Sequence, residues 1–146
     1  MSRDWIFVPV ILQVFLTLFV YLRLLQVKKR ASAAGQVDRT RVALRDDAWP
    51  DYVIQVNNNI RNQFELPVLF YVLAILLWVL DSVHGVAVAA ATVFVLSRIV
   101  HAGIHLSINA IPPRRHLFTV GWLAVLAMAV LVLWELMRRA GGLGPY

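Results

Sequence analysis

Polar side chains interrupt an otherwise apolar stretch between residues 86 and 110. Their spacing of three or four residues places them on one face of an α-helix. They are Arg98, His101, His105 and Asn109. An ionisable side chain in a long apolar helix is energetically costly, so it normally faces a partner, water or a ligand. This stripe therefore indicates a polar site, and Ala87 and Ala91 continue the same face as small residues.

A second polar stripe precedes the apolar run that starts at Leu66. Its members fall within about 100° of each other on a helix. They are Asn58, Arg61, Asn62 and Glu65. Arg61 and Glu65 form an i, i+4 pair that could simply neutralise itself at a helix entrance, and the pair alone favours that interpretation. If the two stripes pack against each other, Glu65 instead supplies the single carboxylate of a basic pocket.

Arg114 and Arg115, in a later loop, and Arg23, near the end of the first apolar run, would add guanidinium groups to this pocket if the helices pack antiparallel. Several guanidiniums favour a ligand with more than one carboxylate or phosphate, because the planar fork binds such groups bidentately. Glu65 and the asparagine amides suit an ammonium and peptide groups. Glutathione, with carboxylates, an ammonium, amides and a thiol, meets these demands.

Each of these groups also has a purely structural interpretation. Arg114 and Arg115 could orient the chain or contact anionic lipid, and the Arg23 side chain could extend to the membrane interface. His101 and His105 have the spacing of two zinc ligands, but no Cys and no further suitably spaced His completes a site. Arg98, one turn away, also disfavours a cation, and we predict no metal site.

The composition indicates an integral membrane protein. Of 146 residues, 60% are hydrophobic and 15% are charged, and the mean hydropathy is +0.71. The absence of Cys excludes a disulfide scaffold, a thiolate metal site and a cysteine nucleophile. The net charge of +6 could suggest a nucleic-acid partner, but the basic residues lie beside apolar segments. Membrane lipids and anionic ligands are therefore the expected partners.

The hydrophobic pattern predicts four transmembrane helices in a single domain over residues 1–146, at about 5–27, 52–80, 86–110 and 117–137. A polar loop over 28–51 separates the first two. The segment 52–65 contains no Pro or Gly, so it is predicted to extend the second helix. Pro112 and Pro113 are predicted to end the third helix. The first run is expected to be a retained helix and not a cleaved signal peptide.

The distribution of basic residues predicts the orientation. Nine lie in or beside the loops after the first and third helices, namely Lys28, Lys29, Arg30, Arg39, Arg41, Arg45, Arg61, Arg114 and Arg115. The opposite side has only Arg3, Arg138 and Arg139. The positive-inside rule therefore places both basic loops in the cytoplasm and both termini on the other side.

Three short motifs resemble the MAPEG family, the membrane-associated proteins in eicosanoid and glutathione metabolism. They are the run from Arg61 to Pro67 (RNQFELP), Arg98-Ile99-Val100-His101, and Pro113-Arg114 ahead of the fourth span. The resemblance extends over nearly the whole chain. It implies an all-α, four-helix membrane bundle that assembles as a homotrimer, with glutathione in clefts between neighbouring subunits facing the cytoplasm.

The resemblance also implies roles for individual residues. It matches Arg23, Arg61, Asn62, Glu65, Arg98 and His101 to glutathione-binding or polar positions of the family. The residue pattern adds His105 and Arg115 to the predicted glutathione-binding set. Arg114 matches the family arginine that lies near the thiol. A cation there would favour the thiolate by lowering the pKa of a thiol that is otherwise about 8.5. The thiolate could then attack a lipophilic electrophile or reduce a hydroperoxide.

Two positions depart from the family pattern. Members often carry tyrosines where this chain has His105 and Phe118. His105 can still donate a hydrogen bond, whereas Phe118 cannot. We therefore expect a glutathione-dependent transferase or peroxidase-like protein, with a noncatalytic lipid-binding or scaffold protein of the same fold as the alternative. A small transporter is the third hypothesis, but the sequence predicts neither broken helices nor an inverted repeat to support it.

Overall fold

The computed structural model describes residues 2–141, and this part of the chain is helical throughout apart from its connecting loops. The elements are η1 (Arg3–Ile6), α1 (Phe7–Ala33), η2 (Asp46–Ala48), α2 (Asp51–Gln63), α3 (Leu66–Val79), α4 (Gly85–Leu106) and α5 (Ile111–Ala140). Within the described residues, four helical stretches are long and apolar enough to cross a membrane. They are Arg3–Ala33, Asp51–Val79, Gly85–Leu106 and Ile111–Ala140. The chain is a multi-pass, all-α membrane protein, as predicted.

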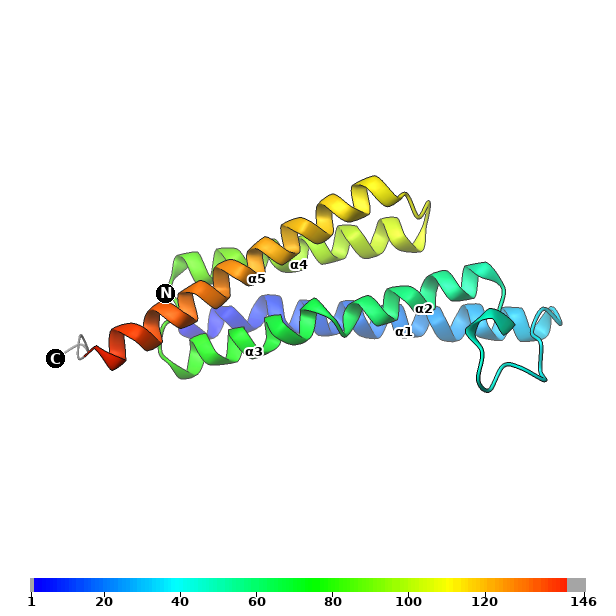
Figure 1. The fold of residues 1–146 in the computed structure, drawn as a ribbon, viewed down its shortest axis with the longest axis horizontal. Helices are drawn as coiled ribbons and strands as arrows, with labels where there is room; N and C mark the ends of the chain where they lie inside the picture. The colour runs from blue at the N-terminus through cyan, green and yellow to red at the C-terminus, as the bar shows by residue number, and fades with distance from the viewer. Residues whose placement is uncertain (1, 142–146) are drawn as a thin grey trace.

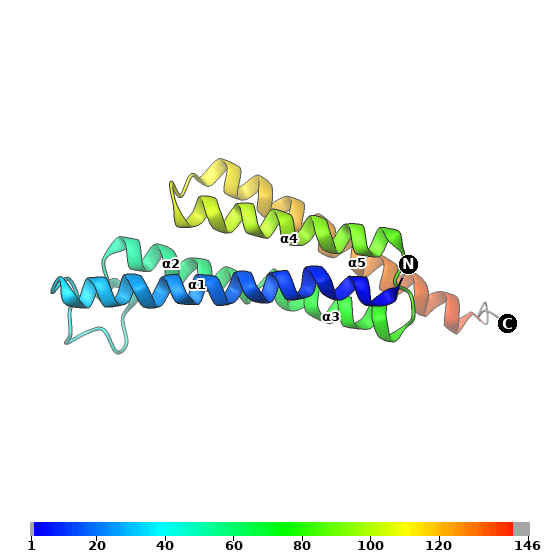
Figure 2. The same ribbon diagram turned by 180° about the vertical axis from the view of Figure 1, so that it is seen from behind.

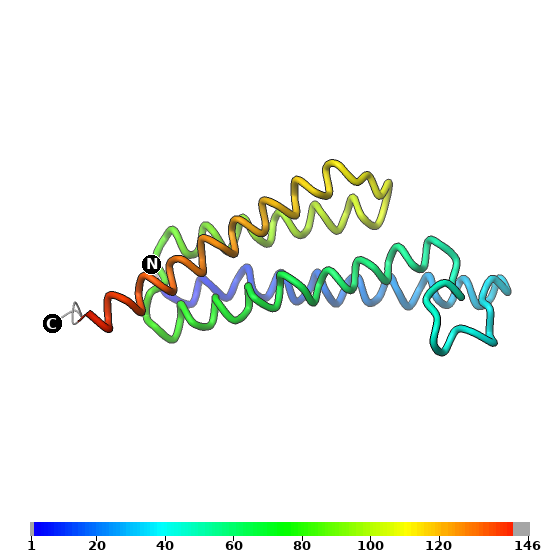
Figure 3. The backbone as a smooth tube through the Cα atoms, viewed as in Figure 1, coloured from blue at the N-terminus to red at the C-terminus, as the bar shows by residue number. Residues whose placement is uncertain are grey.

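The helices form two layers, and neighbouring helices within each layer run antiparallel. α1 lies against α2 and α3, and α4 lies against α5 (Figures 1 and 2). The two layers diverge toward the α4–α5 connection, as the backbone tube in Figure 3 shows. The start of η1 and the end of α5 lie at one end of the bundle, and the 34–50 loop and the α4–α5 connection lie toward the other. The two basic loops therefore lie toward the same end of the bundle, and the side of the membrane that they face stays a prediction.

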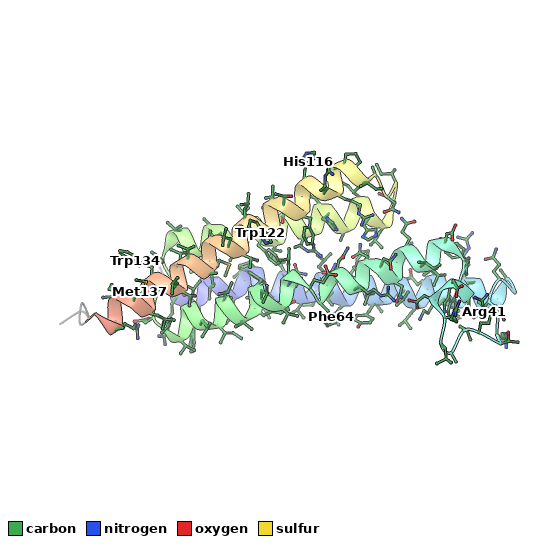
Figure 4. The ribbon with its side chains drawn as sticks, in the orientation of Figure 1. Arg41, Phe64, His116, Trp122, Trp134 and Met137 are labelled. Atoms are coloured by element: carbon green, nitrogen blue, oxygen red, sulfur yellow. The ribbon has the colours of Figure 1, made fainter. Side chains whose placement is uncertain are left out.

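Aliphatic and aromatic side chains cover the outside of the bundle as well as its core. Phe15, Leu25 and Trp134 are all more than half exposed. In Figure 4, Trp134 and Met137 point outward from α5. Such a surface is stable only beside another apolar medium, and lipid tails provide one. Inside, Phe70 of α3 stacks on Phe94 of α4 with ring centroids 4.4 Å apart, which joins the two layers.

The second span is broken, whereas the sequence analysis predicted one helix over 52–80. α2 ends at Gln63 and α3 begins at Leu66. Pro67 lies in the first turn of α3. It has no N–H to donate to the carbonyl of Gln63, and its ring would clash with that carbonyl in a continuous helix. The segment 52–65 itself contains no Pro or Gly, and the residue that breaks the helix lies just beyond it, at the second position of the apolar run.

The connection between the last two spans also differs from the prediction. α4 ends at Leu106, before Asn109, which adopts a left-handed conformation with φ of 52°. Pro112 and Pro113 do not end the third span. They start the fourth, because the first turn of a helix needs no N–H donors from these positions. α5 therefore begins at Ile111, six residues earlier than expected.

The first basic loop is shorter than predicted, since α1 continues to Ala33. The loop folds on its own polar contacts. Arg41 pairs with Asp47 at 2.6 Å. The hydroxyl and backbone N–H of Thr40 both donate to Asp38 and hold the pKa of that carboxyl below its ordinary value. Arg41 and Arg45, two of the cations on which the predicted orientation rests, are thus paired with a carboxylate of the same loop.

α4 and α5 approach each other closely at Gly121. A Cβ at this position would lie 3.0 Å from Ser97 Oγ, 3.6 Å from Phe94 Cδ2 and 3.8 Å from Arg98 Cδ. Glycine is therefore needed here for packing and not for an unusual backbone angle. The contact matters for the site described below, because Arg98 lies on the same face of α4.

Gly121→Leu should lower the stability of the protein by about 1–3 kcal/mol, because the added side chain forces α4 and α5 apart. Gly103→Leu is the matched control, since a Cβ at Gly103 would meet nothing within 4 Å. Thermal unfolding of purified protein in detergent measures both. Equal melting temperatures for the two variants would contradict the close approach at Gly121.

The orientation can be tested because the chain contains no native cysteine. Ser32 and His84 are exposed at opposite ends of the bundle. A membrane-impermeant maleimide should label Ser32→Cys from the cytoplasmic side only and His84→Cys from the opposite side only. The reverse labelling pattern in sealed vesicles would invert the predicted orientation.

Candidate functional site: a polar cleft between the two layers

A cleft of about 490 Å³ opens between the two layers near the α4–α5 connection. Its walls come from the α2–α3 break, from α4 and from the start of α5. The lining residues are Asn62, Glu65, His101, Ile111, Arg114, Arg115 and Phe118. This volume lies within the range of about 300–1,000 Å³ that is typical of small-molecule sites.

The polar stripe of α4 faces inward, as predicted. The exposed fraction is 0% for Arg98, 3% for His101 and 2% for His105. Arg98 donates from Nη2 to the carbonyl of Asn62 at 2.8 Å, across the gap to α2. Its Nε and Nη1 atoms are buried without a hydrogen-bond partner among the described residues. The fourth predicted member, Asn109, lies beyond the helix in the α4–α5 connection.

The helix break places Glu65 at the mouth of the cleft. Among residues 2–141, no cationic side chain lies within ion-pair distance of its carboxylate, although that charge acts electrostatically on Arg98. Asn62, near the end of α2, also lines the cleft. It contacts His105, with 3.4 Å between its Nδ2 and the ring Nδ1. The cleft therefore has one carboxylate and one amide on its α2–α3 wall.

The opposite wall is cationic. Arg114 donates from Nη1 to the side-chain oxygen of Asn109, and its Nε is buried without a partner in the described part of the chain. Arg115 lines the cleft beside it. Phe118 completes this wall, with its ring centroid 6.1 Å from that of His101 and 5.9 Å from the Arg98 guanidinium carbon. The cationic wall thus continues into an apolar one.

Two predicted arginines lie elsewhere in the single chain. Arg61 pairs with Asp46 of the preceding loop and not with Glu65, which rules out the i, i+4 pair considered above. Arg23 is exposed on α1 and donates to Gln26 at 2.7 Å. Neither residue lines the cleft, and their binding roles stay predictions.

A chain of buried amides, which the sequence analysis missed, supports the site. Gln13 donates to Gln63 at 2.8 Å, Gln63 donates to Asn59 at 2.9 Å, and Asn59 donates to the carbonyl of Ala102 at 3.3 Å. Gln55 donates to the carbonyl of His105 at 2.6 Å. These side chains tie α1, α2 and the last turns of α4 together. The lone Gln13 in an apolar run was the available signal.

This arrangement suits an anionic ligand better than a metal. The cationic groups near the cleft exceed the carboxylates, and several of their N–H groups lack partners. Within the described residues, no cluster of His, Asp or Glu has the arrangement of a metal site. Planar guanidiniums bind carboxylate or phosphate groups strongly, because their fork of N–H groups matches two oxygens at once.

The fold and the cleft define a four-span helical membrane protein with a polar ligand site between its layers. The chain belongs to the MAPEG family, whose family model matches residues 6–134. Comparisons with curated proteins and with solved structures gave no match. Family membership supports a general role at the membrane in glutathione or eicosanoid metabolism.

Replacing Gln63 with Leu should destabilise the protein, because Gln13 and Asn59 each lose a buried hydrogen-bond partner. The expected cost is about 1–3 kcal/mol. The double variant Gln13→Leu/Gln63→Leu removes both members of one pair and should recover part of that loss. Additive losses in thermal unfolding would contradict a coupled amide chain.

Proposed function

We propose that this protein is a glutathione-dependent transferase or peroxidase-like enzyme that acts on lipophilic electrophiles. The observation that carries the proposal is the buried Nε of Arg114, which has no partner among the described residues and belongs to a residue that lines a cleft of ligand size. Nε and Nη1 of Arg98, a residue that packs against the lining residue Phe118, also lack partners there. A buried donor without a partner costs about 1–3 kcal/mol. A ligand with carboxylates would remove that cost.

The distribution of charge suggests how glutathione would lie. Glu65 suits the ammonium group, and the guanidiniums of the opposite wall suit the carboxylates and the sulfur. Arg114 is the candidate for stabilising the thiolate, because its guanidinium lies at the cleft and can release Asn109 in favour of an anion. Arg98, His101, His105 and Arg115 would bind or position the rest of the ligand.

The apolar part of the cleft suits the second substrate. Ile111 and Phe118 form an apolar surface next to the cationic wall. A lipophilic electrophile could enter from the bilayer and meet the sulfur there. Phe118 has no hydroxyl to stabilise a leaving group, so the same surface also suits a noncatalytic lipid-binding or scaffold role, which is the second candidate function.

A homotrimer is part of the proposal. In one chain Arg23 is exposed on α1, outside the cleft. If the cleft of a neighbouring subunit packs against this face of α1, Arg23 could complete the glutathione site of that neighbour at the cytoplasmic end. Chemical crosslinking and mass measurement of the detergent-solubilised protein test this assembly.

Titration with glutathione, followed by calorimetry or thermal shift, tests the site directly. Wild-type protein should show a saturable rise in melting temperature. Glu65→Gln and Arg114→Ala should each weaken binding about tenfold or more, since each removes a charged contact. Arg39→Ala is the control, because it removes the same charge from an exposed loop position far from the cleft.

The two candidate functions give different results. Saturable binding with turnover of electrophiles or hydroperoxides supports the enzyme. An intact trimer that shows no response to millimolar glutathione and binds apolar ligands saturably would overturn it in favour of the lipid-binding protein. Loss of binding in Arg39→Ala as well would show that net charge, and not the cleft, causes the response.

A further inference from the structure

The hydrogen bond between His101 and the backbone of Arg114 fixes the tautomer of this imidazole. His101 Nδ1 lies 3.0 Å from the carbonyl oxygen of Arg114. A carbonyl oxygen can only accept, so Nδ1 carries the proton and donates it. In the neutral ring, Nε2 is then left with a lone pair and no hydrogen.

His101 Nε2 is buried and has no hydrogen-bond partner among the described residues. The ring lines the cleft, and the residue is only 3% exposed. The contact to Arg114 ties this ring to the helix turn that carries the candidate thiolate-stabilising guanidinium. An acceptor without a donor therefore lies beside the group proposed to hold the sulfur.

We infer that His101 is the general base that takes the proton from the thiol of bound glutathione, an inference that rests on the proposed function. The S–H bond breaks, the proton bonds to the Nε2 lone pair, and the electron pair stays on sulfur. The thiolate pairs with Arg114, and Nδ1–H stays bonded to the Arg114 carbonyl. The arrangement follows the general logic of a nucleophile, a base and a group that orients the base.

The charges around His101 are compatible with this step only when the thiolate forms at the same time. Arg98 lies one turn before His101 on α4, and the backbone of Arg114 contacts Nδ1 of the ring, so two cationic residues oppose a further positive charge there. Proton transfer creates the imidazolium together with an adjacent thiolate. The net charge of the site does not change, and Glu65 on the other wall adds further compensation.

His105 does not have the same role. Its Nδ1 faces the amide nitrogen of Asn62 at 3.4 Å, and an amide nitrogen donates. The proton of the neutral ring is then on Nε2, which makes His105 a hydrogen-bond donor on its other side. The two imidazoles, with ring centroids 5.9 Å apart, therefore present opposite hydrogen-bonding character.

If His101 takes the thiol proton, thiolate should form without release of that proton to the solvent. Glutathione is mixed with the wild-type protein in weakly buffered detergent solution. The ultraviolet absorbance of the thiolate reports ionisation, and a pH-indicator dye reports protons released. Wild-type protein should form thiolate with much less than one proton released for each thiolate, because His101 keeps it.

Two substitutions separate a base from a structural residue. His101→Gln keeps an N–H that can donate to the Arg114 carbonyl but has no basic nitrogen. His101→Phe removes both nitrogens. At glutathione concentrations that saturate each variant by thermal shift, both should form at least about tenfold less thiolate than wild-type protein, or form it only with stoichiometric proton release. His116→Phe is the control, because His116 is exposed and points away from the cleft in Figure 4.

Each alternative result is decisive. Stoichiometric proton release by wild-type protein, or normal thiolate formation in His101→Gln, would overturn the role of His101 and leave the glutathione site intact. Glutathione binding without any thiolate would also overturn it. Absence of binding in wild-type protein would overturn the proposed function itself, and the base with it.

Discussion

Pro67 has no backbone N–H, so the second span cannot run through the membrane as one helix, and the geometry of the cleft depends on that constraint. The break leaves carbonyl groups at the end of α2 without partners in their own helix. In a bilayer these groups need partners from the protein. Arg98 meets part of this need by donating to the carbonyl of Asn62 from the neighbouring layer. The same break places Glu65 at the cleft.

Polar contacts, more than apolar packing, distinguish the inside of this bundle from its outside. Aliphatic side chains are equally at home against lipid, so they give little preference for one arrangement of helices over another. The amide chain from Gln13 to Asn59 and the bond from Gln55 to α4 are directional and fix the helices relative to each other. These polar groups therefore hold α2 against α4, the two helices that carry Asn62 and His101 of the cleft.

The arginines show how one residue type takes different roles in one chain. Arg41 and Arg61 pair with aspartates of the first loop, where solvent screening makes such contacts weak. Arg98 and Arg114 are directed inward with N–H groups that the described residues do not satisfy. Retaining such groups lowers stability, and the cost is understandable where a ligand completes the hydrogen bonds. The same reasoning applies to Nε2 of His101.

The sequence by itself determined the four spans, the sharing of one end by the two basic loops, and the inward polar face of α4, because hydropathy and helical periodicity are local properties. It also identified Asn62, Glu65 and Arg114 as residues of one site. Only the tertiary structure decided that Arg61 turns to Asp46, that Arg23 stays outside the cleft of its own chain, and that Gln13 meets Gln63. These outcomes depend on which long side chain reaches which partner across two layers, and residue spacing along one helix carries no information about that distance.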